Sequence, residues 1–117
     1  MSHTCHAHGC TRAVPPAMWG CRTHWFSLPK NIRNAVYREY RPGQEDDKQP
    51  SLRYMAVQRL AVAHTAFKPY DEYAAYVAAY YTTEALVWRE KAIKAGQGDP
   101  LEGLLSKLPP VAGAVSA

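Results

Sequence analysis

The hydrophobic positions of this chain fall mainly at helical spacing. From residue 28 onward, apolar residues recur every three or four positions, and no convincing run alternates with the period of two that marks a strand. This pattern predicts three helices, over 28–40, 52–67 and 70–95, and a short fourth helix over 100–108. We therefore expect a mainly α fold, in which residues 28–95 form a three-helix bundle.

The first predicted helix, over 28–40, has one apolar side and one basic side. Ser27 is a suitable N-cap, and Pro29 suits the first turn. The apolar stripe consists of Leu28, Ile32, Val36 and Tyr40. The opposite side has cations, an amide and an aromatic ring, and no acid: Lys30, Arg33, Asn34, Tyr37 and Arg41. This side is either a phosphate-contacting surface or an ordinary solvated helix face.

The second predicted helix, over 52–67, begins after Ser51, a suitable N-cap. Its apolar face consists of Leu52, Ala56, Leu60, Ala63 and Phe67. His64 borders this face. A single histidine in such a place is more often a packed residue with one hydrogen bond than a ligand or a catalytic base, and we interpret it so.

The third predicted helix, over 70–95, is the longest and has two apolar sides. One side is aromatic and the other is rich in alanine; the aromatic side has Tyr73, Tyr76, Val77, Tyr80, Val87 and Trp88, and the other has Ala74, Ala75, Ala78, Ala79 and Ala85. Alanines allow another helix to approach closely, and tyrosines are enriched at interfaces. A helix that is apolar on both sides is expected to be buried on both. Either two other helices cover it, or Tyr73, Tyr76 and Tyr80 form a homodimer or partner interface.

Beyond residue 95 the sequence predicts a flexible segment, 96–117. Gly96 is a plausible helix C-cap, and Gly96-Gln97-Gly98 is expected to act as a hinge. Asp99 then has the character of an N-cap for the helix over 100–108, and Pro109 and Pro110 end that helix.

The richest chemistry lies at the N-terminal end, where residues 5–24 contain all three cysteines and three of the five histidines. The spacing Cys5-x4-Cys10-x10-Cys21-x2-His24 gives two close pairs joined by a short linker. Thiolate and imidazole together are ligands that Zn²⁺ accepts in tetrahedral structural sites. We therefore predict a zinc knuckle over 1–27, packed on the helical bundle as part of one domain.

Several alternatives to this ligand set stay open. His6 or His8 lies close enough to replace Cys5 or Cys10, and a reduced, metal-free cluster is also possible. Four good ligands favour a closed structural site over a catalytic one with a free position for water. Met18 and Trp19 are expected to cover the metal, and Trp25 and Phe26 to dock the knuckle on the helices.

The charge of the chain is unevenly distributed. The formal net charge is +4, yet residues 1–60 have nine Lys/Arg against four acids, whereas residues 61–117 have five against six. A basic half that also holds the metal ligands is typical of nucleic-acid contact. The competing interpretation is a soluble surface with a modest excess of cations.

Composition also narrows the cellular context. No run of about 20 apolar residues appears, so we expect no membrane span. The first residues lack the charged and apolar pattern of a signal peptide, and three cysteines suit a metal site better than a disulfide framework. A cytoplasmic protein is expected.

Residues 5–51 resemble a group of small proteins encoded by phages and prophages. The shared motifs are Cys5-x4-Cys10, Val14-Pro15-Pro16-x-Met18-x2-Cys21-x2-His24-Trp25, Leu28-Pro29-Lys30 and Tyr40-Arg41-Pro42-Gly43-Gln44-Glu45-x-Asp47-Lys48-x-Pro50-Ser51. The resemblance implies a phage-type origin and a shared metal module. It also implies that the segment 40–51 folds against that module.

These observations leave two functional hypotheses, both of them binding roles. The chain lacks a nucleophile–base pair, a phosphate-binding glycine loop and a zincin-type motif, so we do not expect an enzyme. The first hypothesis is a zinc-stabilised nucleic-acid-binding accessory protein that uses Arg22, Lys30, Arg33, Tyr37 and Arg41. The second is a phage-encoded protein-interaction factor, such as an inhibitor of a host defence nucleoprotein complex, that uses the tyrosines of the third helix.

Overall fold

The computed structural model of the chain describes residues 3–15, 17–41, 44, 50–66 and 71–104. Within these ranges, two short strands precede four helices. The strands are β1 (His3–Thr4) and β2 (Ala13–Val14), and the helices are α1 (Arg22–Ser27), α2 (Lys30–Glu39), α4 (Leu52–Ala66) and α5 (Glu72–Lys94). The strands pair antiparallel, with His3 opposite Val14. The fold is mainly helical, as the sequence predicted.

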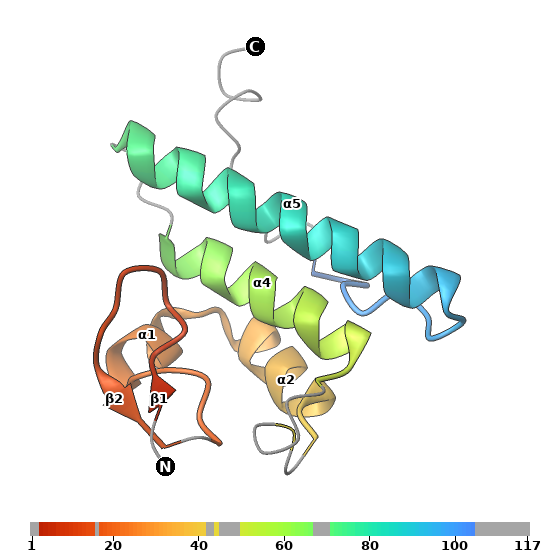
Figure 1. Cartoon of the computed structure of the whole chain (residues 1–117), viewed down its shortest axis with the longest axis horizontal. Coiled ribbons are helices and arrows are strands. Elements are labelled where there is room, and N and C mark those ends of the chain that lie inside the picture. Colours follow the sequence, from red (N-terminus) through yellow and green to blue (C-terminus); the bar gives the residue numbers. More distant parts are fainter. Residues whose placement is uncertain (1–2, 16, 42–43, 45–49, 67–70, 105–117) are drawn as a thin grey trace.

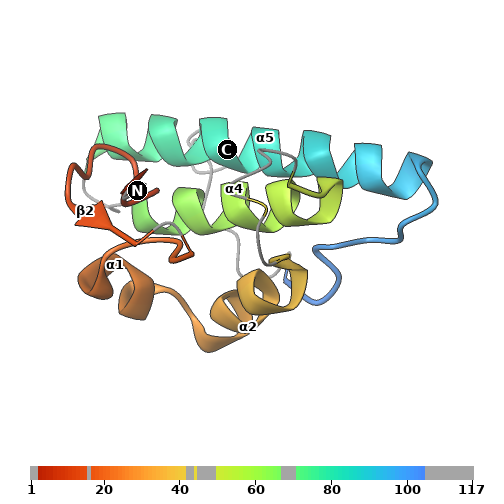
Figure 2. The same ribbon diagram turned by 60° about the horizontal axis from the view of Figure 1, so that its bottom comes forward.

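The helices form three layers, with α4 in the middle (Figure 2). Helix α5 covers one side of α4, and α1 and α2 lie on the other. The middle position explains why α4 is buried around most of its circumference; its buried residues are Tyr54, Ala56, Val57, Gln58, Leu60, Ala61, Val62 and Ala63. The single apolar face predicted for this helix was therefore too narrow. Phe67, the last residue of that predicted face, lies outside the described residues.

Helix α5 lies alongside α4 (Figure 1). Its buried residues are mostly small: Ala74, Val77, Ala78, Thr82, Ala85 and Ala92. Alanines on both helices remove the bulk that would otherwise separate the two backbones. An ion pair between Arg59 of α4 and Glu84 of α5, 3.1 Å apart, adds a polar link between the two helices.

The other side of α5 is exposed. The exposed fractions of Tyr73, Tyr76 and Tyr80 are 69%, 68% and 54%. Of the two alternatives for this helix, the described helices of the chain do not cover the tyrosine side, and the interface alternative stays a prediction. Val77, which the sequence placed on the aromatic side, is instead buried with the alanines.

The junction between α1 and α2 differs from the prediction of one helix over 28–40. A residue before proline is pushed toward extended backbone, and Leu28 has φ −76° and ψ 144°. Helix α1 therefore ends at Ser27, and α2 begins at Lys30 after Pro29. The Ser27 hydroxyl does not cap α2, because it donates to the His24 carbonyl at 2.6 Å. Leu28 is buried as predicted, but it precedes the helix.

The starts of the two long helices have side-chain caps. The Ser51 hydroxyl accepts a hydrogen bond from the Tyr54 backbone N–H at 3.0 Å, which confirms the predicted cap of α4. At α5, the Asp71 carboxylate accepts from the backbone N–H groups of Tyr73 and Ala74 at 3.0 and 3.1 Å. This second cap was not predicted.

The segment after α5 folds back against α2 and α4. Residues 100–104 form turns, so the predicted helix over 100–108 is not formed in its described part; residues 105–108 lie outside the described residues. Pro100, Leu101 and Leu104 are buried. Gly96 follows the end of α5 with φ +78°, the left-handed conformation that glycine favours at a helix C-terminus.

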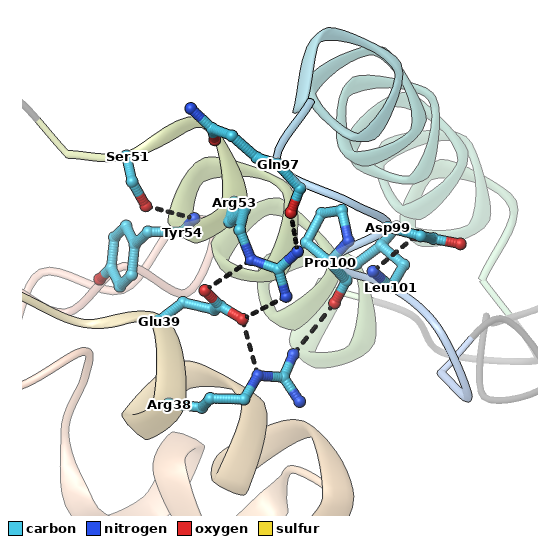
Figure 3. Close-up of polar contacts among 9 residues, drawn as sticks. All are labelled: Arg38, Glu39, Ser51, Arg53, Tyr54, Gln97, Asp99, Pro100 and Leu101. Atoms are coloured by element: carbon cyan, nitrogen blue, oxygen red, sulfur yellow. Dashed lines mark hydrogen bonds and ion pairs between the residues drawn. The ribbon is translucent and has the colours of Figure 1, made fainter. Parts of the chain in front are cut away.

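A polar network fixes this segment (Figure 3). Arg53 of α4 donates to both carboxylate oxygens of Glu39 of α2 at 2.9 Å, and to the Gln97 carbonyl at 2.6 Å. Arg38 donates to Glu39 at 2.6 Å and to the Pro100 carbonyl at 3.2 Å. Residues 97 and 100 are thus tied to two helices, so the predicted hinge over 96–98 is instead anchored.

Charge and burial oppose each other at Glu39. Burial raises the pKa of its carboxyl, but the hydrogen bonds and charges of Arg53 and Arg38 outweigh that effect and hold the pKa below its ordinary value. Asp99 has a pKa below the ordinary range mainly because it accepts a hydrogen bond from Arg89 at 3.0 Å. Both carboxylates are therefore stabilised in their charged form.

The N-terminal residues share their core with the helices. Cys5, Ala7, Val14, Trp19 and Cys21 belong to one buried cluster that continues through the apolar residues of α2, α4 and the turns after α5. The knuckle thus packs on the helices as part of a single core.

Candidate metal centre and adjoining basic surface

Two backbone hydrogen bonds between distant segments bring the four predicted ligands together. The Cys5 N–H donates to the Arg12 carbonyl at 2.9 Å, and the His6 N–H donates to the Trp19 carbonyl at 3.1 Å. The first bond continues the β1–β2 pairing, and the second brings the segment before α1 alongside Cys5. Cys21 is the N-cap of α1, and His24 lies one turn later in that helix. Ligands from three separated positions therefore converge on one point.

Two glycines make this local path possible. The Cys10 N–H closes a turn onto the Ala7 carbonyl at 3.0 Å, and Gly9 within the turn has φ +81°. Gly20 approaches the cluster closely, because a Cβ built on it would lie 2.8 Å from the Cys5 Sγ atom. A side chain at position 20 would therefore displace a ligand sulfur.

The four ligand atoms of Cys5, Cys10, Cys21 and His24 all lie within 4.8 Å of one another. The His24 Nδ1 atom is 3.2 Å from the Cys21 Sγ and 3.5 Å from the Cys5 Sγ. Tetrahedral zinc, with Zn–S bonds of about 2.3 Å and Zn–N bonds of about 2.0 Å, separates S and N ligand atoms by roughly 3.5 Å. The predicted residues therefore form a group whose geometry is compatible with a bound metal ion.

The protein environment acts on the thiols in opposite directions. Burial raises the pKa of the Cys5 thiol. The pKa of the Cys21 thiol is lowered, first of all by a hydrogen bond from the His24 backbone N–H in the first turn of α1. The three cysteines form no disulfide with one another. All three thiols are thus available as ligands.

The alternative ligands His6 and His8 lie outside this group. The His6 ring packs against Trp19, with ring centroids 6.3 Å apart. His8 is exposed and contacts α5, where its Nδ1 atom is 3.4 Å from the Tyr81 hydroxyl. His8 thus links the knuckle to α5, and the set with three cysteines and His24 is the one that the structure gathers.

Met18 and Trp19, and likewise Trp25 and Phe26, were predicted to pack at the cluster or on the helices. In each pair, one residue is buried or packed as predicted and the other is exposed. Trp19 is 5% exposed and belongs to the core, whereas Met18 is 46% exposed. Trp25 packs against the core, whereas Phe26 is 58% exposed. Met18 and Phe26 were therefore predicted to be more buried than they are.

The predicted basic residues lie along α1 and α2. Lys30 and Arg41 flank opposite ends of α2 and are both exposed, as is Arg22 on α1. Arg33 is half-buried, and its Nε atom donates to the Leu28 carbonyl at 3.3 Å. Tyr37 is 70% exposed. The structure brings Arg22 and Arg33 together on Phe26, whereas Lys30 begins α2 and Arg41 follows its end.

Phe26 joins the two arginines, and sequence reasoning missed it. The guanidinium carbon atoms of Arg22 and Arg33 lie 5.6 and 5.3 Å from the centre of the Phe26 ring, within the range of a cation–π contact. Arg22 and Phe26 are four residues apart, a spacing that places side chains together on a helix. That signal was overlooked because no helix was predicted over 22–27.

The remaining predicted residues have no contact with the metal group among the described residues. Tyr73, Tyr76 and Tyr80 line the exposed side of α5, where the Tyr80 hydroxyl donates to Glu84 at 3.3 Å. The negative charge of Glu84 raises the pKa of Tyr80. His64 is half-buried on α4 and is not one of the grouped ligands.

Comparisons with protein-family models, curated proteins and solved structures find no match to this chain. Among the described helices, none combines the length and apolar character needed to cross a bilayer.

Proposed function

We propose that this chain is a small, zinc-stabilised, nucleic-acid-binding accessory protein of phage-type origin, without a catalytic role. Cys5, Cys10, Cys21 and His24 would hold one Zn²⁺ ion. Three thiolates and one imidazole fill a tetrahedral shell, so that no position is left for a reactive water. In this proposal the ion holds the knuckle together and performs no chemistry.

The observation that carries the proposal is the Arg22–Phe26–Arg33 cluster on the surface beside the metal group. Phe26 is a large apolar side chain that is 58% exposed, and it holds two guanidinium groups against its ring. A guanidinium that is stacked in this way loses less freedom when it binds a phosphate. An exposed Tyr37 one helical turn from Arg33 adds a stacking surface.

The charge of the surroundings favours a polyanionic partner. Lys30 and Arg41 extend the cationic surface along α2, and the acid of that helix, Glu39, is already paired with Arg53 and Arg38. Phosphate contacts of this kind supply affinity that falls steeply with salt, because each contact releases a condensed counterion.

The test of the proposal is equilibrium binding to labelled single-stranded and double-stranded oligonucleotides over a range of salt concentrations. The variant Arg22→Gln/Arg33→Gln should weaken binding and reduce the slope of log K against log salt by about 1.4 for single strands, since two phosphate contacts are lost. The matched control is Lys91→Gln/Lys94→Gln, which removes the same charge from α5 and should leave the slope unchanged. Equal losses in both variants would contradict an interface on α1 and α2.

The zinc assignment has a separate measurement. Native mass spectrometry should detect one zinc per chain, and replacement by Co²⁺ should give the absorption bands of a tetrahedral thiolate site. Purified protein that binds no zinc, even when zinc is added in slight excess, would overturn this part of the proposal.

One observation favours a second candidate, a phage-encoded protein-interaction factor acting on a host nucleoprotein complex or dimerising through α5. Tyr73 and Tyr76 are exposed on a stretch, 73–83, that has no charged residue. If this side is the working surface, Tyr73→Ser/Tyr76→Ser should abolish partner binding or dimerisation with little dependence on salt. The arginine variants should then have no effect.

A further inference from the structure

A hollow of about 160 Å³ lies between the knuckle, α2 and α4. Five of its nine lining residues are aromatic, and they come from four separate parts of the chain: Trp19, Trp25, Tyr37, Tyr40 and Tyr54. The other lining residues are Ala17, Met18, Gly20 and Val36. No spacing rule in the sequence brings these rings together, because only the folded knuckle places Trp19 and Trp25 beside α2.

The walls of the hollow are rings in mutual contact. The Trp25 and Tyr37 rings meet edge to face with centroids 5.2 Å apart. Trp19 and Trp25 are 6.3 Å apart, as are Tyr40 and Tyr54. Rings held by neighbouring rings offer flat, rigid faces at low entropic cost. Such faces suit another flat ring better than a flexible aliphatic chain.

The charges near the hollow select the kind of ring. Among the described residues, the lining of the hollow includes no acid and no cation, so no described carboxylate would attract a cationic ligand. Arg33 lies one turn before Tyr37 on α2, and Arg22 shares Phe26 with Arg33. An aromatic ring attached to an anion therefore matches the described residues better than a methylated ammonium group.

We propose that the hollow binds one unpaired nucleobase, while Arg22 and Arg33 hold a phosphate of the same strand. This inference rests on the proposed nucleic-acid function and makes it more specific, since it requires a single-stranded target or an unpaired base. The base would enter the hollow and stack on the exposed ring of Tyr37. The indole N–H of Trp19, which is buried and has no hydrogen-bond acceptor among the described residues, marks a further unsatisfied polar group in the wall.

The closing experiment measures binding of a short single-stranded oligonucleotide to wild type, Tyr37→Leu and the matched control Tyr76→Leu. Tyr37 and Tyr76 are 70% and 68% exposed, so each substitution should leave the fold intact, and thermal melting checks that. Loss of one stacked base should weaken binding by Tyr37→Leu about tenfold or more. The salt slope should stay unchanged, because the tyrosine contacts no phosphate. The control should bind like wild type, and a fully paired duplex should bind more weakly than the single strand.

The outcomes separate the two proposals. If wild type binds the oligonucleotide and Tyr37→Leu binds equally well, the base pocket is wrong and the nucleic-acid function stands. If Tyr37→Leu changes the salt slope as the arginine variant does, Tyr37 supports phosphate contacts and the pocket is again wrong. If wild type binds no nucleic acid, both proposals fall, and an aromatic side chain of a partner protein becomes the occupant to examine.

Discussion

The knuckle (residues 3–28) and the pair of helices α4 and α5 are stabilised by different means. The knuckle has two strands of two residues each and a helix of six residues, elements that are too short to be stable alone. Its four ligand groups lie at its centre. The helix pair instead buries small apolar residues along two long elements. If the proposed metal is bound, one region depends on a few strong metal–ligand bonds, and the other depends on many weak contacts.

The two regions are therefore expected to be sensitive to different kinds of substitution. In the knuckle, each ligand atom of the proposed metal has no substitute, whereas most exposed residues are expected to tolerate change. In the helix pair, no residue is indispensable, but each buried alanine fixes the distance between two backbones. Changes that remove a ligand and changes that add volume should therefore act on different regions.

The largest effect is expected from loss of the metal. Chelation, or the variant Cys21→Ser, should unfold residues 3–28, because metal binding in such modules contributes on the order of 10 kcal/mol to folding. Hydrogen exchange should show the amides of Cys5, His6 and Trp25 losing protection, while the middle of α4 keeps it. The control Thr11→Ser changes an exposed residue and should exchange like wild type. If neither chelation nor Cys21→Ser changed the melting curve, the structural-metal assignment would be wrong.

A smaller effect is expected from added volume between α4 and α5. Ala78 is fully buried, and Ala78→Leu should lower the free energy of unfolding by about 1–3 kcal/mol through overpacking. Chemical denaturation measures this loss, and zinc content should stay at one ion per chain. Ala95→Leu makes the same change at an exposed position and should cost far less. If Ala78→Leu lost zinc, packing between α4 and α5 would be coupled to the knuckle, and the two regions would not be independent.

The smallest of these effects concerns the polar network that joins α2 to α4 and to the segment after α5. Glu39→Gln should cost about 1 kcal/mol at neutral pH, because the charge that pairs with Arg53 is removed. The folded pKa of Glu39 lies below its ordinary value. Its contribution is therefore complete above the unfolded pKa of about 4.3 and is lost as the pH falls through the folded value.

The pH dependence supplies the measurement. Between pH 6 and pH 3, the melting temperature of wild type should fall more than that of Glu39→Gln, so that the two curves converge in acid. Protonation of the metal ligands affects both proteins alike, and the difference between the curves isolates Glu39. Glu90→Gln, an exposed change on α5, should follow wild type. A constant gap at all pH values would show that Glu39 acts by shape and not by charge.

Local spacing in the sequence was enough to predict the helical class, the grouping of the three cysteines with His24 and the Ser51 cap. The Cys21-x2-His24 pair and the Ser51 hydroxyl act over one helical turn, a range at which residue order fixes geometry. The separate helix α1 was missed because the restriction that Pro29 places on Leu28 was not applied.

The features that escaped prediction depend on contacts between distant segments. Because both sides of α5 are apolar in sequence, the pattern could not predict which side faces α4. The structure buries the alanines and exposes Tyr73 and Tyr76. Likewise, the anchoring of Gln97 by Arg53 joins residues 44 positions apart. Periodicity identifies an apolar face, but it does not name the partner of that face.

The middle position of α4 has a consequence for the order in which the chain is made. Synthesis starts at the N-terminus, so all four metal ligands and α2 leave the ribosome before α4. The side of α4 that packs on α5 then has no cover until residues 72–94 have emerged. At that stage a nascent chain could already bind the proposed metal, while the residues of α4 that α5 will bury are still in contact with water. During this period α4 is open to aggregation or to chaperone binding.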